Sequence, residues 1–167
     1  MLNLWGNGYT RRAATANRGS THNKDSERQN PMTNDPKGEA VFAFHRWNNA
    51  FNQRDKDGQL DSMHFPHFRI AKKEMDVWET PDDWLVKEDE QTERLEAEGW
   101  HHTTTVSIEA VQANKEKVHL IIKQSRRNEN DAEYLSFDTL WIFTNEEGRW
   151  GAKFRSSFVN FSSPTDN

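Results

Sequence analysis

The second half of the sequence limits the fold most strongly, because it is a succession of long apolar segments divided by short polar turns. The apolar segments are residues 100–113, 117–127, 134–144 and 149–158. Asn, Asp, Glu and Gly residues occupy the intervals, where they favour tight turns. Extended segments joined this closely pair with their neighbours, so this half of the chain predicts an antiparallel meander.

Two helices are predicted before the meander. Apolar residues within 38–54 recur at spacings of four, three and four, which places them on one face of a helix. These residues are Ala40, Phe44, Trp47 and Phe51. A second helix is predicted over residues 80–98, because Thr80 suits its N-terminal cap and Pro81 its first turn. Gly99 follows and suits a left-handed end of this helix.

A short helical turn and a β-hairpin are predicted between the two helices. The turn covers residues 59–63, and the hairpin pairs residues 64–70 with residues 75–79. Pro66 cannot donate a backbone hydrogen bond, so the first strand of the hairpin is expected to lie at an edge or to carry a bulge. Helix, hairpin, helix and meander in this order indicate an α+β fold.

The strands lack the sharp alternation of a sheet that has one face in water. Phe137, Trp141 and Phe143 occupy one side of the third apolar segment. Leu140 and Ile142 occupy its other side, so both sides are apolar. We therefore expect helices to cover one face of the sheet and a second copy of the chain to cover the other, in a homodimer.

Composition and motifs exclude several functional classes. The formal net charge is −5, and residues 1–24 hold four basic and no acidic residues, which leaves −9 for the remainder. Such an acidic body does not favour nucleic-acid binding. No segment approaches the roughly 18 apolar residues that cross a bilayer, so no membrane span is expected. The chain has no cysteine, which fits a cytoplasmic location, and no P-loop or dinucleotide glycine motif, so no cofactor is expected.

One domain is predicted over residues 38–158, between two disordered tails. Residues 1–37 are rich in Asn, Thr, Ser, Arg and Gly and have no apolar periodicity beyond their first few positions. Their arginine content is compatible with an organelle-targeting peptide; alternatively, the natural chain starts at Met32, which opens a polar lead-in to the first helix. Residues 159–167 are the expected C-terminal tail.

Three motifs carry a resemblance to a known family. They are HFPHFRI after the first helix, VWETPDDW before the second, and FDTLWIFTNEEGRWGAKFRSSF at the end of the meander. With these motifs, residues 38–158 resemble the nuclear-transport-factor-2-like superfamily of SnoaL-like and ketosteroid-isomerase-like proteins. The resemblance implies a cone-shaped curved antiparallel sheet wrapped around N-terminal helices, a cystatin-like α+β roll. It also implies a mostly apolar pocket for a small organic molecule.

The resemblance leaves the reaction open. Family members include isomerases, dehydratases, cyclases, epoxide hydrolases, ligand binders and non-catalytic association domains. The Tyr and Asp set of the ketosteroid isomerases has no matching local motif in this sequence. We expect a small-molecule-binding domain that works as a cofactor-independent isomerase or lyase, with a non-catalytic dimerisation or association module as the alternative.

The candidate catalytic residues are two histidines and an aspartate. His67 or His102 can act as a general base, since an unperturbed histidine titrates near neutrality. Asp138 is expected to pair with Arg126 or Arg155, and the paired guanidinium to stabilise an enolate-like oxygen. In the alternative interpretation the histidines belong to a hydrogen-bonded edge strand, the rim or the dimer interface, and the ion pair is purely structural.

Arg69, Trp78 and Trp141 complete the predicted ligand-binding residues. Arg69 shares a strand face with His67, so it can bind an anionic or carbonyl oxygen. The tryptophans either line an aromatic pocket or belong to the core. His64 and His67 are three residues apart on a strand and face opposite sides, so only a bulge at Pro66 could bring both to one ion. No nearby carboxylate has a spacing that completes a site, so no metal site is expected.

Overall fold

The computed structural model describes residues 35–159. The expected tails, residues 1–37 and 159–167, lie almost entirely outside these residues. At the two boundaries, Pro36 and Lys37 belong to the first helix and Val159 is buried.

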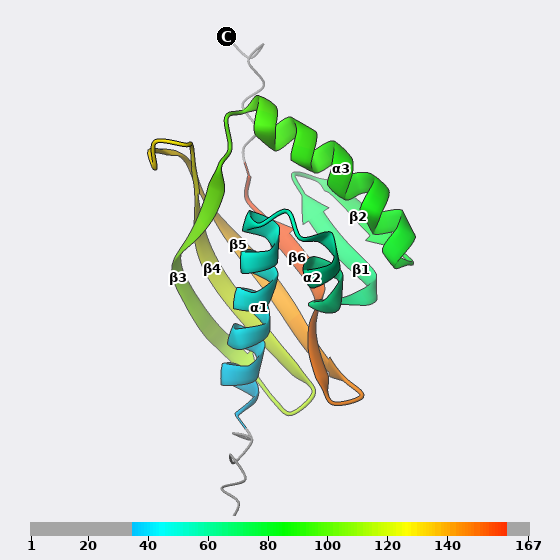
Figure 1. The fold of residues 1–167 in the computed structure, drawn as a ribbon. Helices are drawn as coiled ribbons and strands as arrows, with labels where there is room; N and C mark the ends of the chain where they lie inside the picture. Colours follow the sequence, from blue (N-terminus) through cyan, green and yellow to red (C-terminus); the bar gives the residue numbers. More distant parts are fainter. Residues whose placement is uncertain (1–34, 160–167) are drawn as a thin grey trace, which may run out of the picture. The chain divides into compact units, whose positions relative to one another are not determined.

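Three helices and six strands form the described part of the chain, in the order that the sequence predicts (Figure 1). The helices are α1 (Pro36–Asn52), α2 (Lys56–Asp61) and α3 (Pro81–Ala97). The strands are β1 (Met63–Ala71), β2 (Glu74–Trp78), β3 (His102–Ala113), β4 (Lys117–Arg127), β5 (Glu133–Glu146) and β6 (Arg149–Ser157). The predicted α+β class is therefore confirmed.

Local side chains determine where the helices begin. Asp35 accepts hydrogen bonds from two backbone N–H groups in the first turn of α1, at 3.1 and 3.2 Å, and so starts this helix two residues before Gly38. Asp55 caps α2 in the same way, so α2 begins at Lys56, ahead of the helical turn predicted for residues 59–63. Thr80 and Asp83 form a reciprocal capping box at the start of α3. Among the described residues, none of these helices is long and apolar enough to cross a bilayer.

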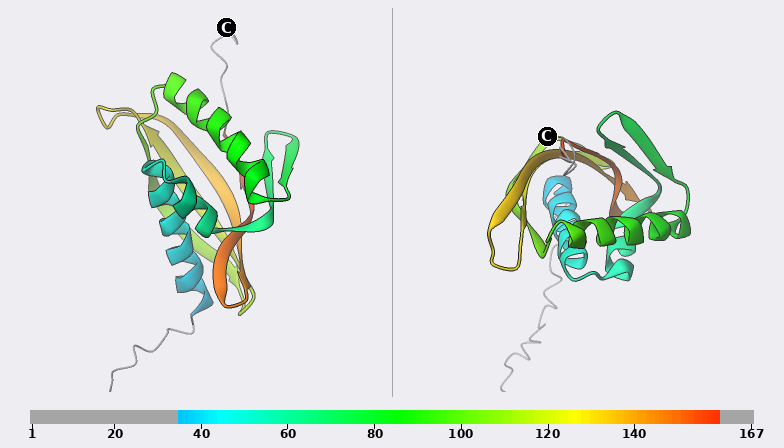
Figure 2. Two further views of the ribbon diagram at one scale, coloured as in Figure 1. Left: turned by 45° about the vertical axis from the view of Figure 1, so that its right-hand side comes forward. Right: turned by 90° about the horizontal axis from the view of Figure 1, so that it is seen from above.

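The six strands form one sheet in the order β2-β1-β6-β5-β4-β3. All neighbours are antiparallel except β1 and β6, which run parallel. The sheet curves around α1, and α3 lies beside the β1–β2 hairpin (Figure 2). This arrangement agrees with the predicted curved sheet wrapped around N-terminal helices.

Pro66 lies in a bulged part of β1. The pairing of β1 with β6 changes register between Met63 and Phe68, on either side of the proline. β1 itself is paired on both sides, and β2 is the edge strand. Of the two alternatives that the proline predicts, the structure contains the bulge.

The core lies between α1 and the concave face of the sheet. Trp47 of α1 contacts Trp141 of β5 with ring centroids 4.7 Å apart, and Phe44 contacts the same tryptophan at 5.5 Å. Phe143 is fully buried on this face, whereas Leu140 and Ile142 on the convex face are only partly buried. The odd-numbered residues of β5 therefore face the helices.

Two phenylalanines of α1 provide a test of this packing. Phe44 has no exposed surface, so Phe44→Ala leaves a cavity and is expected to lower the free energy of unfolding by about 3–5 kcal/mol. Phe42 is 63% exposed on the same helix, and Phe42→Ala is expected to cost less than about 1 kcal/mol. Urea unfolding followed by far-UV circular dichroism measures both; equal losses for the two variants would contradict this core.

Candidate functional site

Two cavities lie side by side at the concave face. The inner cavity has a volume of about 40 Å³ and the outer cavity of about 200 Å³. The inner cavity is lined by Trp47, Phe51, Arg69, Gln91, Thr103, Gln124, Arg126, Phe137, Trp141, Arg155, Ser157 and Val159. The outer cavity is lined by Arg69, Asp76, Trp78, Trp84, Lys87, Glu88, Glu90, Gln91, Arg94 and Arg155. Arg69, Gln91 and Arg155 line both cavities, so these three side chains form a wall that the two cavities share.

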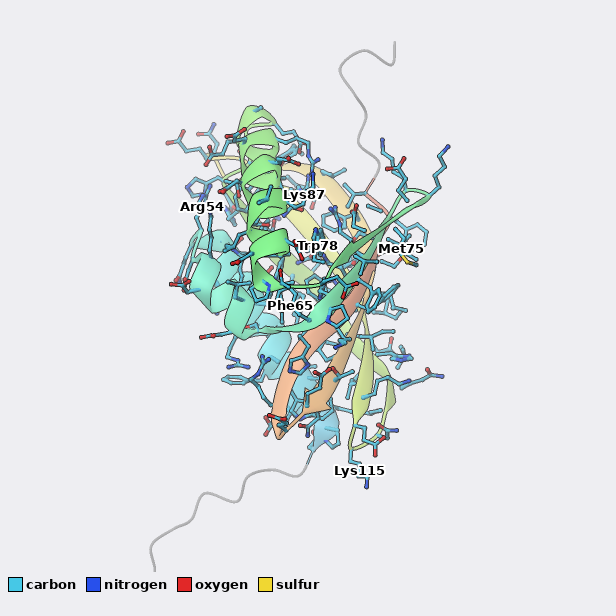
Figure 3. The ribbon with its side chains drawn as sticks, turned by 90° about the vertical axis from the view of Figure 1, so that its right-hand side faces the viewer. Arg54, Phe65, Met75, Trp78, Lys87 and Lys115 are labelled. Atoms are coloured by element: carbon cyan, nitrogen blue, oxygen red, sulfur yellow. The ribbon has the colours of Figure 1, made fainter. Side chains whose placement is uncertain are left out.

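The outer cavity lies at the side of the molecule where α3 passes the β1–β2 hairpin. Figure 3 views this side and labels Trp78 at the end of β2 and Lys87 on α3. Both cavities contain charged side chains, so the expectation of a mostly apolar pocket is wrong. The apolar character is what the family resemblance implies, whereas Arg69, Arg126 and Arg155 of this chain line the inner cavity.

Arg155 stands at the centre of the site, enclosed by tryptophans. On β6 it is the pairing partner of Trp141 on one side and of Arg69 on the other. Its guanidinium carbon lies 5.5 Å from the ring centroid of Trp141 and 5.6 Å from those of Trp47 and Trp78. Burial, together with the nearby charge of Arg69, lowers the pKa of Arg155 to about 9, so the side chain remains charged at neutral pH.

The two other arginines of the inner cavity have carboxylate partners. Arg126 donates to Glu98, at the end of α3, over 2.9 Å. Arg69 lies 3.9 Å from Asp76 of β2. Burial lowers the pKa of both arginines, and these carboxylates oppose the shift.

The predicted pairing of Asp138 with Arg126 or Arg155 is wrong. Asp138 is exposed on the convex face, where it is the pairing partner of Lys123. Its even position on β5 points it away from the helices, whereas Arg126 and Arg155 point toward them.

Glu88 of α3 is a buried carboxyl group that the sequence argument missed. Only 4% of its surface is exposed, and Gln91 donates a hydrogen bond to it over 3.1 Å. Burial raises the pKa of Glu88 to about 7, although the charge of Arg155 acts in the opposite direction. Trp84, Glu88 and Leu95 are the buried residues of α3. Their spacings of four and seven place them on one helix face, a pattern visible in the sequence.

His67 is held next to the site but lines neither cavity. Its Nδ1 lies 2.9 Å from the carbonyl oxygen of Ala152, and its ring stacks on Trp78 with centroids 5.6 Å apart. A carbonyl oxygen only accepts, so Nδ1 carries the proton. Burial, reinforced by the charge of Arg155, lowers the pKa of His67 to about 3, so the imidazole is neutral.

The other predicted histidines lie outside the two cavities. His102 is partly exposed, with Nε2 3.3 Å from Asp131 and Nδ1 3.0 Å from Nδ1 of His101. His64 contacts Thr144 on β5 at 2.9 Å, so it and His67 have separate partners. Within residues 35–159, no group of three or more His, Asp or Glu side chains is placed to hold a metal ion.

Comparisons with known proteins identify the family. Helices packed against the concave face of a curved sheet define the class of cystatin-like α+β folds. The sequence matches the family described as NTF2-like protein (DUF6841) over residues 39–152, and the chain belongs to this family. A search of curated proteins finds no match to the sequence.

Solved structures share this fold at low sequence identity. An NTF-2 like protein of unknown function from Shewanella oneidensis MR-1 is 13% identical, with a TM-score of 0.60 over 74% of this chain and 98% of that one. An NTF2-like protein with a cystatin-like fold from Novosphingobium aromaticivorans is 13% identical, with a TM-score of 0.61 over 77% and 84%. A ketosteroid isomerase-like protein from Erwinia carotovora atroseptica is 12% identical, with a TM-score of 0.56 over 72% and 92%. The predicted resemblance is confirmed at the level of the fold.

The buried carboxyl group makes stability depend on pH. Glu88 binds its proton more tightly in the folded chain, where its pKa is about 7, than at the ordinary value of 4.5. Tighter proton binding by Glu88 therefore stabilises the folded state fully below pH 4.5, and this stabilisation is lost as the pH rises through 7. Relative to Glu88→Gln, the wild type is expected to lose roughly 3 kcal/mol of unfolding free energy across this interval.

Urea titrations at pH 4.5, 6 and 8 measure the pH effect, with Glu93→Gln as the matched control. Glu93 is exposed on the same helix, so its replacement is expected to leave the pH dependence unchanged. A Glu88→Gln variant with the same pH dependence as the wild type would contradict the buried position of this carboxyl group.

Proposed function

We propose that this chain binds a small organic molecule in the adjoining inner and outer cavities. The observation that supports the proposal is the buried carboxyl group of Glu88 in the wall of a cavity of about 200 Å³ that Arg155 also lines. Removing a carboxyl group from water is costly, and strongly shifted groups gather at functional sites. The two cavities together have room for a small ligand.

We propose further that the chain is a cofactor-independent isomerase or lyase in which Glu88 moves the proton. With a pKa of about 7, Glu88 is present in both protonation states near neutral pH, which suits a general acid–base. Its carboxylate takes a proton from a carbon next to a carbonyl group, and the electron pair moves onto the carbonyl oxygen. The charge of Arg155 stabilises the resulting enolate.

Two outcomes complete the reaction. In an isomerase that acts on a β,γ-unsaturated carbonyl compound, the protonated Glu88 returns the proton to the γ-carbon, and the double bond moves into conjugation with the regenerated carbonyl group. In a lyase, the enolate expels a leaving group from the neighbouring carbon, and the proton of Glu88 leaves with that group.

The predicted ligand-binding residues retain this role in the proposal. Arg69, Arg126 and Trp141 line the inner cavity, and Trp78 lines the outer one. His67 is proposed to act through Trp78, on which it stacks, and so to position the ligand. His102 and Asp138 line neither cavity, and we propose no part for them in the proton transfer.

A ligand screen with a proton-exchange measurement tests this function. Small carbonyl compounds that bind are expected to raise the melting temperature with increasing concentration, by mass action. In D₂O, nuclear magnetic resonance is then expected to detect exchange of the hydrogens beside the carbonyl group of the bound compound. Glu88→Gln is expected to retain the thermal shift and to reduce the exchange rate at least about 100-fold.

The outcomes separate the two parts of the proposal. A thermal shift without exchange would leave a binding protein and remove the catalytic assignment. The absence of any thermal shift across the screen would remove both parts. Glu93→Gln is the matched control, since its side chain is exposed on α3 and lines neither cavity.

The convex face of the sheet supports a second candidate function, a homodimeric association module. Ile121 of β4 is 41% exposed there, beside the partly buried Leu140 and Ile142 of β5. Exposed apolar side chains that adjoin on a sheet suit pairing with a second copy of the chain. We propose that the protein is a homodimer through this face and that it works in the cytoplasm.

Sedimentation equilibrium tests the dimer. The wild type is expected to sediment as a dimer, and Ile121→Arg as a monomer, because a charge on the apolar face opposes its burial. Val86→Arg is the control, since Val86 is exposed on α3, away from this face. A monomeric wild type, or equal dissociation by both variants, would contradict the proposed interface.

A further inference from the structure

The inner cavity is strongly positive. Arg69, Arg126 and Arg155 reach it from β1, β4 and β6, and its lining contains no Asp or Glu. Buried charges are stable when opposite charges neutralise them. Within residues 35–159, Arg126 has Glu98 as its partner, whereas no carboxylate oxygen lies within 4.0 Å of a nitrogen of Arg155.

The carboxylates nearest to Arg155 neutralise it poorly. Asp76 is 3.9 Å from Arg69, and its side chain is about half exposed to water. Glu88 acts on Arg155 from the outer cavity, where burial holds its pKa at about 7, so part of its population is uncharged at neutral pH. The inner cavity therefore retains positive charge.

Hydrogen-bond donors without acceptors surround the same space. Among the described residues, Nε1 of Trp47, Nε1 of Trp141, Nε of Arg69 and Nε of Arg155 are buried and have no hydrogen-bond partner. Each of these atoms can only donate. Unsatisfied buried donors are unfavourable, so four of them around one cavity indicate a group with several acceptor oxygens.

The volume of the inner cavity limits the size of this group. About 40 Å³ accommodates roughly three water-sized groups, which matches the three heavy atoms of a carboxylate. A planar carboxylate also matches two N–H donors of a guanidinium and fits beside flat aromatic walls. The outer cavity is five times larger and shares Arg69, Gln91 and Arg155 with the inner cavity, so it can hold the remainder of a small molecule.

We propose that the ligand is a small organic carboxylic acid whose carboxylate binds in the inner cavity between Arg155, Arg69 and the indole N–H groups of Trp47 and Trp141. The remainder of the molecule lies in the outer cavity beside Glu88. This assignment rests on the proposed ligand-binding function and adds the chemical class of the ligand. It also explains why a fully buried arginine is surrounded by tryptophans instead of by carboxylates.

Matched acids and amides test the assignment. The probes are propanoate and 2-oxobutanoate, their neutral amides, and inorganic phosphate, each titrated at pH 7 by calorimetry and thermal shift. The acids are expected to bind and the amides to bind at least about tenfold more weakly, because only the acids neutralise the cavity.

Variants locate the carboxylate. Arg155→Met is expected to weaken binding of 2-oxobutanoate at least about tenfold. The same change is expected to raise the melting temperature of the free protein, since it removes a buried charge that has no close carboxylate partner. An arginine that only supported the fold would lower the melting temperature when replaced. Trp141→Phe removes one N–H donor and keeps most of the ring, and is expected to weaken binding about two- to tenfold.

Arg127→Met is the matched control, on β4 of the same sheet. Arg127 is partly exposed, lines neither cavity and already pairs with Asp131, so its replacement is expected to leave binding unchanged. Amides that bind as well as the acids would overturn the carboxylate assignment and leave the proposed function standing. Phosphate that binds as tightly as the acids would replace the assignment with an inorganic anion, and no binding by any probe would overturn both.

Discussion

Trp141 packs against side chains from two other elements at once, and the arrangement of the concave face depends on these contacts. Trp47 of α1 lies 4.7 Å from its ring centroid and Phe44 5.5 Å, while the guanidinium carbon of Arg155 lies 5.5 Å away on the neighbouring strand. Together these contacts fix α1 against β5 and β6. Their aromatic rings fill part of the concave face, and the arginines line the inner cavity that is left beside them.

The register of α3 determines the electrostatics of that remaining space. The capping box of Thr80 and Asp83 defines where the helix starts, and from there the helical repeat directs Glu88 toward the outer cavity. Glu98, just after the last turn, reaches Arg126. One local motif thus positions a carboxyl group beside Arg155 and a carboxylate on Arg126, although these arginines belong to different strands.

The sequence predicts the fold well because its patterns are local. Apolar spacing, Thr80-Pro81 and Gly99 mark the helices, and the short turns mark the meander to within a few residues. The site is predicted less well, because it depends on which strand faces lie inward and on how the strands pair. The sequence predicts that Asp138 of β5 pairs with Arg126 or Arg155, whereas Arg126 pairs with Glu98, which directly follows α3. Contacts between helix and sheet that are 28 residues apart in sequence leave no periodic pattern.

The tryptophans around Arg155 have a spectroscopic consequence. Indole emission depends on the polarity and charge of its surroundings, and the rings of Trp47, Trp78 and Trp141 all lie within 5.6 Å of the same guanidinium carbon. A molecule that enters either cavity changes the electric field at these rings. The intrinsic fluorescence of these three tryptophans, which also line the cavities, therefore reports whether a ligand is bound. No attached dye is required.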